Sequence, residues 1–245
     1  MIAIYFHRQL ALPILLFGVS IGLIETCPSF GAEQKAYAAG ELELQASSVY
    51  IHVGKTGFGH EHAVLGKLAS GTVRLGVSEN AGSLVFNMAS FVADVEQARK
   101  FLRMEPDTDQ ATRAKVTANM IGPHVLDVAK FPTAMFNIQS THQLPQPSKR
   151  GLAIYEFQGI FTLHGQSRPI KFPVEVEQRG TWTRLMGNFS LLQTDYGIKP
   201  FTTALGAIGV ADRLTIYGDL WVANTANPVK ANAQRPARTN QPATR

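Results

Sequence analysis

The chain has 245 residues, of which 45% are hydrophobic and only 17% are charged, and its formal net charge is +5. This composition excludes a wholly disordered chain, which would combine low hydrophobicity with high charge. The length allows one large domain or two small ones, with enough apolar residues for a real core.

The first 38 residues are typical of a signal peptide. Arg8 precedes a mostly apolar run at residues 10–24, which is shorter than the roughly 20 apolar residues of a membrane span. Residues 36–38 (Ala-Tyr-Ala) form a candidate cleavage site, and residues 29–31 form a second one. An uncleaved N-terminal anchor and a lipoprotein site at Cys27, the only cysteine, are the alternatives. Cleavage would give a periplasmic or secreted protein without cysteine.

The other end of the chain, residues 223–245, is rich in Ala, Asn, Gln, Thr, Pro and Arg and has no acidic residue. It cannot bury enough apolar surface to offset its ordering entropy, which predicts a disordered basic tail. This tail carries +4 of the net charge, whereas residues 39–222 carry only +1. The basic character therefore does not indicate nucleic-acid binding by the folded part.

Alternation of apolar and polar residues dominates residues 39–222 and predicts strands. The run at residues 170–177 is the clearest, and Pro173 on its outward side indicates an edge or a bulge. Similar patterns predict seven further strands, around residues 49–53, 73–77, 84–88, 134–138, 155–163, 182–191 and 214–222.

Helical character is confined to residues 95–103 and 109–120, which lack Gly and Pro and follow acidic residues. No strand–helix alternation recurs, so a parallel α/β sheet is excluded. The pattern predicts an all-β fold, an antiparallel eight-stranded barrel with a short helical insertion. The interior of such a barrel is either filled by side chains or holds one small ligand.

Six phenylalanines fall on the apolar side of their predicted strands. They are Phe86, Phe136, Phe157, Phe161, Phe172 and Phe189. Two interpretations remain open from the pattern: an ordinary packed core, and the lining of an elongated apolar cavity.

Four segments give the chain a resemblance to a known family. They are residues 48–73, 126–136 (LDVAKFPTAMF), 163–170 (LHGQSRPI), and 194–198 together with 214–216. The second segment is similar to the F-D-V-x-x-[YF]-P-x-x-x-F motif of the YceI family, and it is the most specific match. The resemblance covers roughly residues 46–222.

The resemblance implies an extended, lipocalin-like eight-stranded barrel in an exported bacterial protein. It also implies a long apolar ligand inside the barrel, such as a polyisoprenoid lipid, an isoprenoid quinone or a fatty acyl compound. The chain departs from the family at Gln193, where many members have arginine, and residues 91–123 match the family loosely.

The segment around His60 and His62 carries the most reactive pattern in the chain. In an extended strand the two imidazoles would share one face and could form half of a zinc or copper site. A pair at the barrel rim that bonds backbone groups, or contacts a ligand head group, is the alternative. His52, His124 and His164 are the candidate third metal ligands.

Motifs of common enzyme classes are missing from the sequence: there is no G-x-S-x-G, no H-E-x-x-H and no P-loop. We therefore expect a binding protein and not an enzyme, with a bound isoprenoid or fatty acyl lipid and no certain cofactor. The ligand-binding candidates are the six phenylalanines with His60 and His62. A metal-binding or structural periplasmic module that uses the two histidines is the alternative. A homodimer and transient contact with a membrane surface are both compatible with the sequence.

Overall fold

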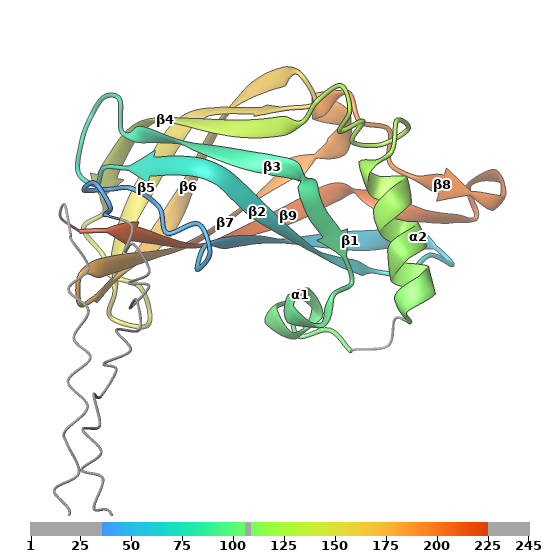
Figure 1. Ribbon diagram of the computed structural model, residues 1–245, viewed down its shortest axis with the longest axis horizontal. Helices are drawn as coiled ribbons and strands as arrows, with labels where there is room; N and C mark the ends of the chain where they lie inside the picture. Colours follow the sequence, from blue (N-terminus) through green and yellow to red (C-terminus); the bar gives the residue numbers. More distant parts are fainter. Residues whose placement is uncertain (1–35, 106–108, 225–245) are drawn as a thin grey trace, which may run out of the picture. The chain divides into compact units, whose positions relative to one another are not determined.

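The computed structural model describes residues 36–105 and 109–224, which form one β-barrel with two short helices (Figure 1). The long strands are β1 (Ser48–Gly57), β2 (His62–Val73), β3 (Gly82–Ala93), β4 (Thr133–Gln143), β5 (Ala153–Leu163), β6 (Gln166–Arg179), β7 (Trp182–Leu192) and β9 (Ile208–Ala223). The helices are α1 (Glu96–Phe101) and α2 (Gln110–Ile121). The short elements are β8 (Thr202–Thr203) and the 3-10 turns η1 (Gln193–Tyr196) and η2 (Ala204–Gly206).

The sheet is antiparallel throughout and closes on itself. Each strand from β1 to β6 pairs with the next one along the chain, β7 pairs with β9, and β9 returns to pair with β1. The closing pair runs from Ser48 opposite Asp219 to Gly57 opposite Ile208. The eight-stranded antiparallel barrel predicted from alternation is therefore confirmed, with the two-residue strand β8 added beside β9.

Strand β4 shows how alternation builds the core. Its side chains alternate strictly between exposed and buried from Thr133 to Ser140. Phe136 and Ile138 are almost completely buried and face the barrel interior. Successive side chains of a strand point to opposite faces, so this one pattern fixes both the strand and its inward side.

The two predicted helices are present and have different positions. Helix α1 packs on the outside of the barrel, where Phe101 stacks on Tyr50 with ring centroids 3.8 Å apart. Helix α2 begins after Asp109, whose carboxylate accepts hydrogen bonds from the N–H groups of Ala111 and Thr112. This is the N-cap that an acidic residue before a helix provides. Figure 1 shows α2 beside the end of the barrel that also carries β8.

The prediction of a strand around residues 73–77 is wrong. Strand β2 occupies His62–Val73, and the chain then turns. Leu75 and Val77 are apolar because they pack on the core from this turn. The Val77 carbonyl accepts a hydrogen bond from the Thr141 N–H, which ties the turn to β4. Alternating apolar residues in a buried turn thus imitated the strand pattern.

Two stretches of the barrel wall have incomplete pairing. Strand β3 pairs with β4 only as far as Asn87 opposite Thr133, and helix α2 packs against the rest of β3. In the described chain, residues 166–173 of β6 pair with β5 but not with β7. Pro173 lies in this second stretch, as its expected edge position requires. The wall is therefore looser at the end that carries α2.

Most of the predicted signal peptide, and the predicted tail from residue 225 onward, lie outside the described residues. Within the candidate cleavage site, Tyr37 packs edge-on against Trp182, with centroids 5.0 Å apart, and bonds Glu43. None of the helices in residues 36–105 and 109–224 is long and apolar enough to span a bilayer.

Candidate ligand cavity

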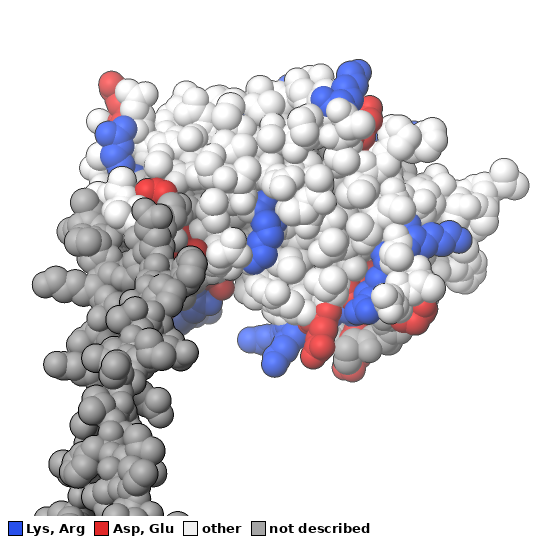
Figure 2. Space-filling model, viewed as in Figure 1, with Lys and Arg blue, Asp and Glu red and all other residues white. Residues whose placement is uncertain are grey.

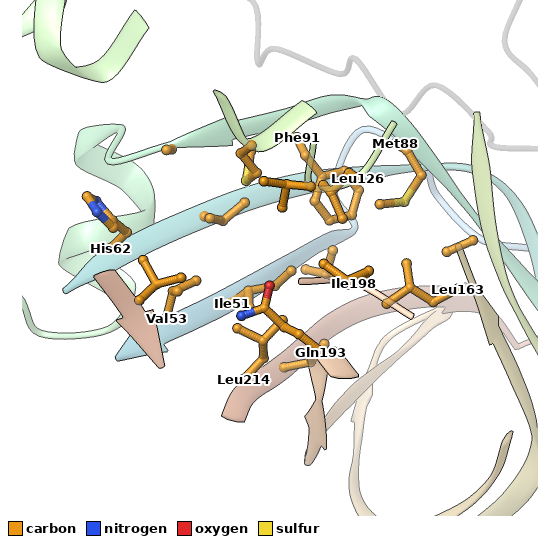
Figure 3. A pocket seen from close by; sticks show the side chains of 18 of the residues that line it. Ile51, Val53, His62, Met88, Phe91, Leu126, Leu163, Gln193, Ile198 and Leu214 are labelled. Carbon is orange, nitrogen blue, oxygen red and sulfur yellow. The ribbon is translucent and has the colours of Figure 1, made fainter. Parts of the chain in front are cut away.

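The larger hollow in the barrel is a cavity of about 170 Å³, which we call the wide cavity. It lies at the end of the barrel where α2 packs, and Figure 3 shows its lining side chains. Strands β1, β2 and β9 contribute Ile51, Val64 and Leu214, and α2 contributes Val116 and Met120. The helix thus closes the side where β3 and β4 are not paired.

The lining of the wide cavity carries almost no polarity. Among the lining residues that the structure describes, only His62, Asn119 and Gln193 are polar, and none is Lys, Arg, Asp or Glu. The amide of Gln193 is already occupied in part, because its Nε2 donates to the Ala211 carbonyl oxygen at 2.8 Å. A charged group inside this cavity would therefore lack an opposite charge, whereas a hydrocarbon chain would not need one.

A second hollow of about 50 Å³, the narrow cavity, continues into the other half of the barrel. Phenylalanines dominate its lining, and all six predicted phenylalanines contact one or both cavities. Phe136, Phe157 and Phe172 line the narrow cavity alone. The prediction that these six rings face the barrel interior is therefore confirmed in position.

Five of the described residues line both cavities: Val49, Ile216 and three phenylalanines. Phe86, Phe161 and Phe189 line both hollows. The rings of Phe86 and Phe161 meet edge to face with centroids 6.1 Å apart, and those of Phe161 and Phe189 do so at 5.6 Å. We call these three rings the partition. Edge-to-face pairs stabilise such an arrangement through the aromatic quadrupoles.

The polar residue at the edge of the wide cavity is His62, the first residue of β2 (Figure 3). Its Nδ1 lies 2.6 Å from Oδ2 of Asp94. Asp94 follows β3, and its side chain is only 1% exposed. The other oxygen, Oδ1, accepts hydrogen bonds from the Ala63 N–H at 3.0 Å and from Arg99 Nη1 at 2.9 Å. Arg99 on α1 also donates through Nε to the Glu105 carbonyl.

Asp94 is ionised at neutral pH for a clear reason. Burial alone would raise the pKa of its carboxyl, but the hydrogen bonds from His62, Ala63 and Arg99 outweigh burial and hold the pKa below its usual value. A carboxylate can only accept hydrogen bonds, so Nδ1 of His62 is the donor of that pair. The network therefore fixes the histidine ring and leaves Nε2 as its second polar atom.

The structure separates the two histidines of the predicted pair. His60 lies in the loop before β2 and is exposed, whereas His62 begins the strand and is half-buried. His60 does not line the wide cavity. Of the candidate third ligands, His52 lies 3.7 Å from Glu61, and His164 faces the Tyr196 carbonyl. Residues 36–105 and 109–224 contain no group of three or more His, Cys, Asp or Glu that could hold a metal ion.

Sequence reasoning missed part of this site. It did not connect Asp94 and Arg99 with His62, and it did not place α2 in the cavity wall. The available signal for Asp94 was its position, because an acidic residue directly after a largely apolar strand and before a helix is a candidate buried anchor. For α2, the apolar pair Val116 and Met120 at a spacing of four residues was the signal.

Known proteins that are similar to this chain were found by sequence and by structure. The model of a family described as YceI-like domain matches residues 41–222. The solved structure of BcnA from Burkholderia cenocepacia is similar at 18% identity and a TM-score of 0.50, over 74% of this chain and 99% of that one. A polyisoprenoid binding domain from Saccharophagus degradans matches at 11% identity and a TM-score of 0.48, over 76% of this chain and 99% of that domain. The YceI protein of Campylobacter jejuni matches at 9% identity and a TM-score of 0.42, over 64% and 83%. No curated protein matches the chain.

Proposed function

The chain belongs to the family described as YceI-like domain, and from this premise we propose that it is a binding protein whose barrel holds the hydrocarbon chain of a lipid. The ligand class is a polyisoprenoid, an isoprenoid quinone or a fatty acyl lipid. One observation carries the proposal: the described residues that line the wide cavity are aliphatic and aromatic except for His62, Asn119 and Gln193, and none of them is Lys, Arg, Asp or Glu.

The energetics favour a hydrocarbon chain in this cavity. Each buried methylene of a ligand contributes about 0.8 kcal/mol through the hydrophobic effect. A carboxylate or phosphate placed between Ile51, Leu126 and Leu214 would lose its hydration without meeting a cation. The polar end of the lipid therefore belongs at the edge of the cavity, where Nε2 of His62 is available to accept a hydrogen bond from a hydroxyl group.

A long chain needs more room than the wide cavity offers. Cavities that enclose drug-sized ligands usually have volumes of about 300–1,000 Å³, whereas the wide cavity has about 170 Å³ and the narrow one about 50 Å³. The partition of Phe86, Phe161 and Phe189 borders both of them. We infer that these rings turn aside when a long chain enters, so that both hollows form one tunnel.

The role that follows is transport, storage or sequestration of the lipid outside the cytoplasm, since the first 38 residues are typical of a signal peptide. Fractionation of cells that produce the full chain tests the location. The mature protein is expected in the periplasm or the medium, and recovery in the cytoplasm with an intact N-terminus contradicts this part of the proposal.

The function is tested by extracting the purified protein with organic solvent and identifying the extract by mass spectrometry. Ala134 is buried and lines the wide cavity, so Ala134→Phe should fill it. Ala114 lies exposed on α2, so Ala114→Phe adds the same ring outside. We expect a stoichiometric lipid in the wild type and in Ala114→Phe, and a reduction of at least tenfold in Ala134→Phe. Circular dichroism checks that both variants are folded. Equal lipid in both variants, or none in the wild type, contradicts the proposal.

A further inference from the structure

Exposed apolar side chains gather at one place on the barrel. Residues 54–60, at the turn from β1 to β2, and residues 199–211, from β8 into β9, form what we call the apolar tip. Six large hydrophobic side chains are exposed in the described chain, and four of them lie in the tip: Phe58, Phe201, Leu205 and Ile208. Phe58 is 84% exposed, and Leu205 is completely exposed. Single exposed apolar residues are ordinary, but a cluster of them indicates an interaction surface.

The tip is an ordered structure and not two loose loops. The Phe58 N–H donates to the Ala207 carbonyl at 3.0 Å, and Gly57 pairs with Ile208. A Cβ at Gly59 would lie 2.2 Å from the carbonyl oxygen of Gly209. Glycine is therefore required where the two backbones touch, and the contact holds Phe58 beside the β8–β9 hairpin.

The backbone presents Leu205 to solvent at an energetic cost. Leu205 has φ 57° and ψ 31°, and Ala204 before it has φ 50°. Both lie in the left-handed region, which branched and bulky side chains rarely adopt. Nothing in the described chain covers Leu205 in return. Strain of this kind, kept at an exposed apolar residue, is typical of a functional position.

The tip adjoins the wide cavity. Phe201 is exposed at the tip and also lines the cavity, and Val210 of β9 lines it as well. The apolar surface of the tip is thus continuous with the apolar lining of the barrel. In Figure 2 the part that projects where Figure 1 labels β8 is white, without charged side chains.

The charges of the tip have one sign. Its two segments contain Lys55 and Lys199 and no acidic residue. The acids that flank them are engaged, because Glu61 lies 3.7 Å from His52 and Asp212 accepts hydrogen bonds from Thr194. An apolar surface with basic residues beside it suits a bilayer that contains anionic lipids.

We propose that the apolar tip docks the barrel on an anionic lipid bilayer, with Phe58 and Leu205 inserted among the acyl chains and the wide cavity open toward the membrane. Phe201 then joins the membrane interior to the cavity, so a lipid enters the barrel without crossing water. This last step rests on the proposed function, whereas docking itself does not.

The first test is sedimentation of the full-length protein with vesicles of phosphatidylethanolamine and phosphatidylglycerol, compared with vesicles of phosphatidylcholine alone. The tip variant combines Phe58→Ser with Leu205→Asn, because asparagine tolerates the left-handed conformation. Met135, 41% exposed on β4, gives the matched control Met135→Ser. We expect the tip variant to bind the anionic vesicles at least tenfold more weakly and the control to bind like the wild type. Lys55→Glu with Lys199→Glu should abolish the preference for anionic vesicles.

The second test uses a fluorescent probe placed in the tip, so membrane contact by the two ends of the chain does not produce its signal. In Leu205→Trp, the indole emission should shift to shorter wavelength when anionic vesicles are added. The two native tryptophans, Trp182 and Trp221, lie on β7 and β9 away from the tip segments, and the wild-type spectrum provides their background.

The proposal is overturned if the tip variant binds vesicles as well as the wild type does. Equal weakening by Met135→Ser, or an unshifted emission of Leu205→Trp, overturns it as well. A homodimer that the tip variant dissociates, without vesicle binding by the wild type, would assign the tip to a second copy of the chain. Lipid extraction from the same preparations keeps the outcomes apart: a protein that docks without bound lipid fails the proposed function, and a loaded protein that does not dock fails only this inference.

Discussion

The two halves of the barrel interior differ in the proportions of their side chains and in the volume that these side chains leave empty. Around the narrow cavity of about 50 Å³, Phe136, Phe157 and Phe172 lie on the neighbouring strands β4, β5 and β6, with the Phe136 and Phe172 centroids 5.6 Å apart. The wide cavity of about 170 Å³ has a larger share of aliphatic side chains, such as Val53 and Val64, beside five phenylalanines.

The difference shows how one sheet can be solid at one end and hollow at the other. Phenylalanine rings make up a larger share of the narrow lining and fill more of its space, whereas many side chains of the wide lining are shorter. The wide half compensates in two ways. Helix α2 covers the part of the wall where β3 and β4 separate, and the bonds among His62, Asp94 and Arg99 hold β2, β3 and α1 together. Packing stabilises one half, and a polar network supports the other.

The largest predicted effect is on the free energy of unfolding, and it is tested by one side-chain truncation in each half. Phe136→Ala should reduce the free energy of unfolding by about 4 kcal/mol, because it empties a closely packed site. Met120→Ala borders space that is already empty, so its cost should be about 1 kcal/mol. Urea unfolding of ligand-free protein measures both values. Similar losses for the two variants would contradict the distinction between a solid half and a hollow half.

The second prediction concerns the network of the wide half. Asp94→Ala should cost about 3 kcal/mol, since it removes a buried carboxylate that accepts hydrogen bonds from His62, Ala63 and Arg99. The folded-state pKa of Asp94 is depressed, so its contribution is present above the usual aspartate pKa of about 3.9 and is lost as the pH falls through the lower folded value. The difference in free energy of unfolding between the wild type and the variant should therefore be large at pH 7 and should shrink in acid. If the difference in free energy of unfolding stays constant from pH 7 into acid, the charge of the Asp94 carboxylate does not stabilise the fold.

The third and smallest prediction uses the two histidines. His62→Ala should cost about 1.5 kcal/mol, because it removes one hydrogen bond to a buried carboxylate. His60→Ala should change stability by less than about 0.5 kcal/mol, as is usual for an exposed loop residue. Thermal unfolding of both variants gives the comparison. Equal effects would mean that the rim network does not support the wide half.

Strand positions could be predicted well from the sequence where one face is buried, and poorly where a turn is buried. Strand β4 follows its alternation from Thr133 to Ser140. Residues 73–77 alternate too, but Leu75 and Val77 reach the core from a turn. Periodicity records which side chains are buried, and it does not record the backbone that buries them.

The residues of the candidate site also fall into a predictable and an unpredictable group. The six phenylalanines were predictable, since each belongs to a strand whose inward side the pattern fixes. The partner of His62 was not, because Asp94 is 32 residues away and reaches it only after β2 and β3 have paired. The partition and the volume of the wide cavity depend on how side chains of different length meet at the axis, which no single strand encodes.

The unpaired stretch of β6 has a consequence for the behaviour of the protein at high concentration. A free strand edge is a template on which a second chain can add by backbone hydrogen bonds. Pro169 and Pro173 lie in this stretch and have no backbone N–H, so neither can donate to an added strand. Lys171 between them adds charge. The stretch of β6 that does not pair with β7 is thus a poor template for fibrous self-association.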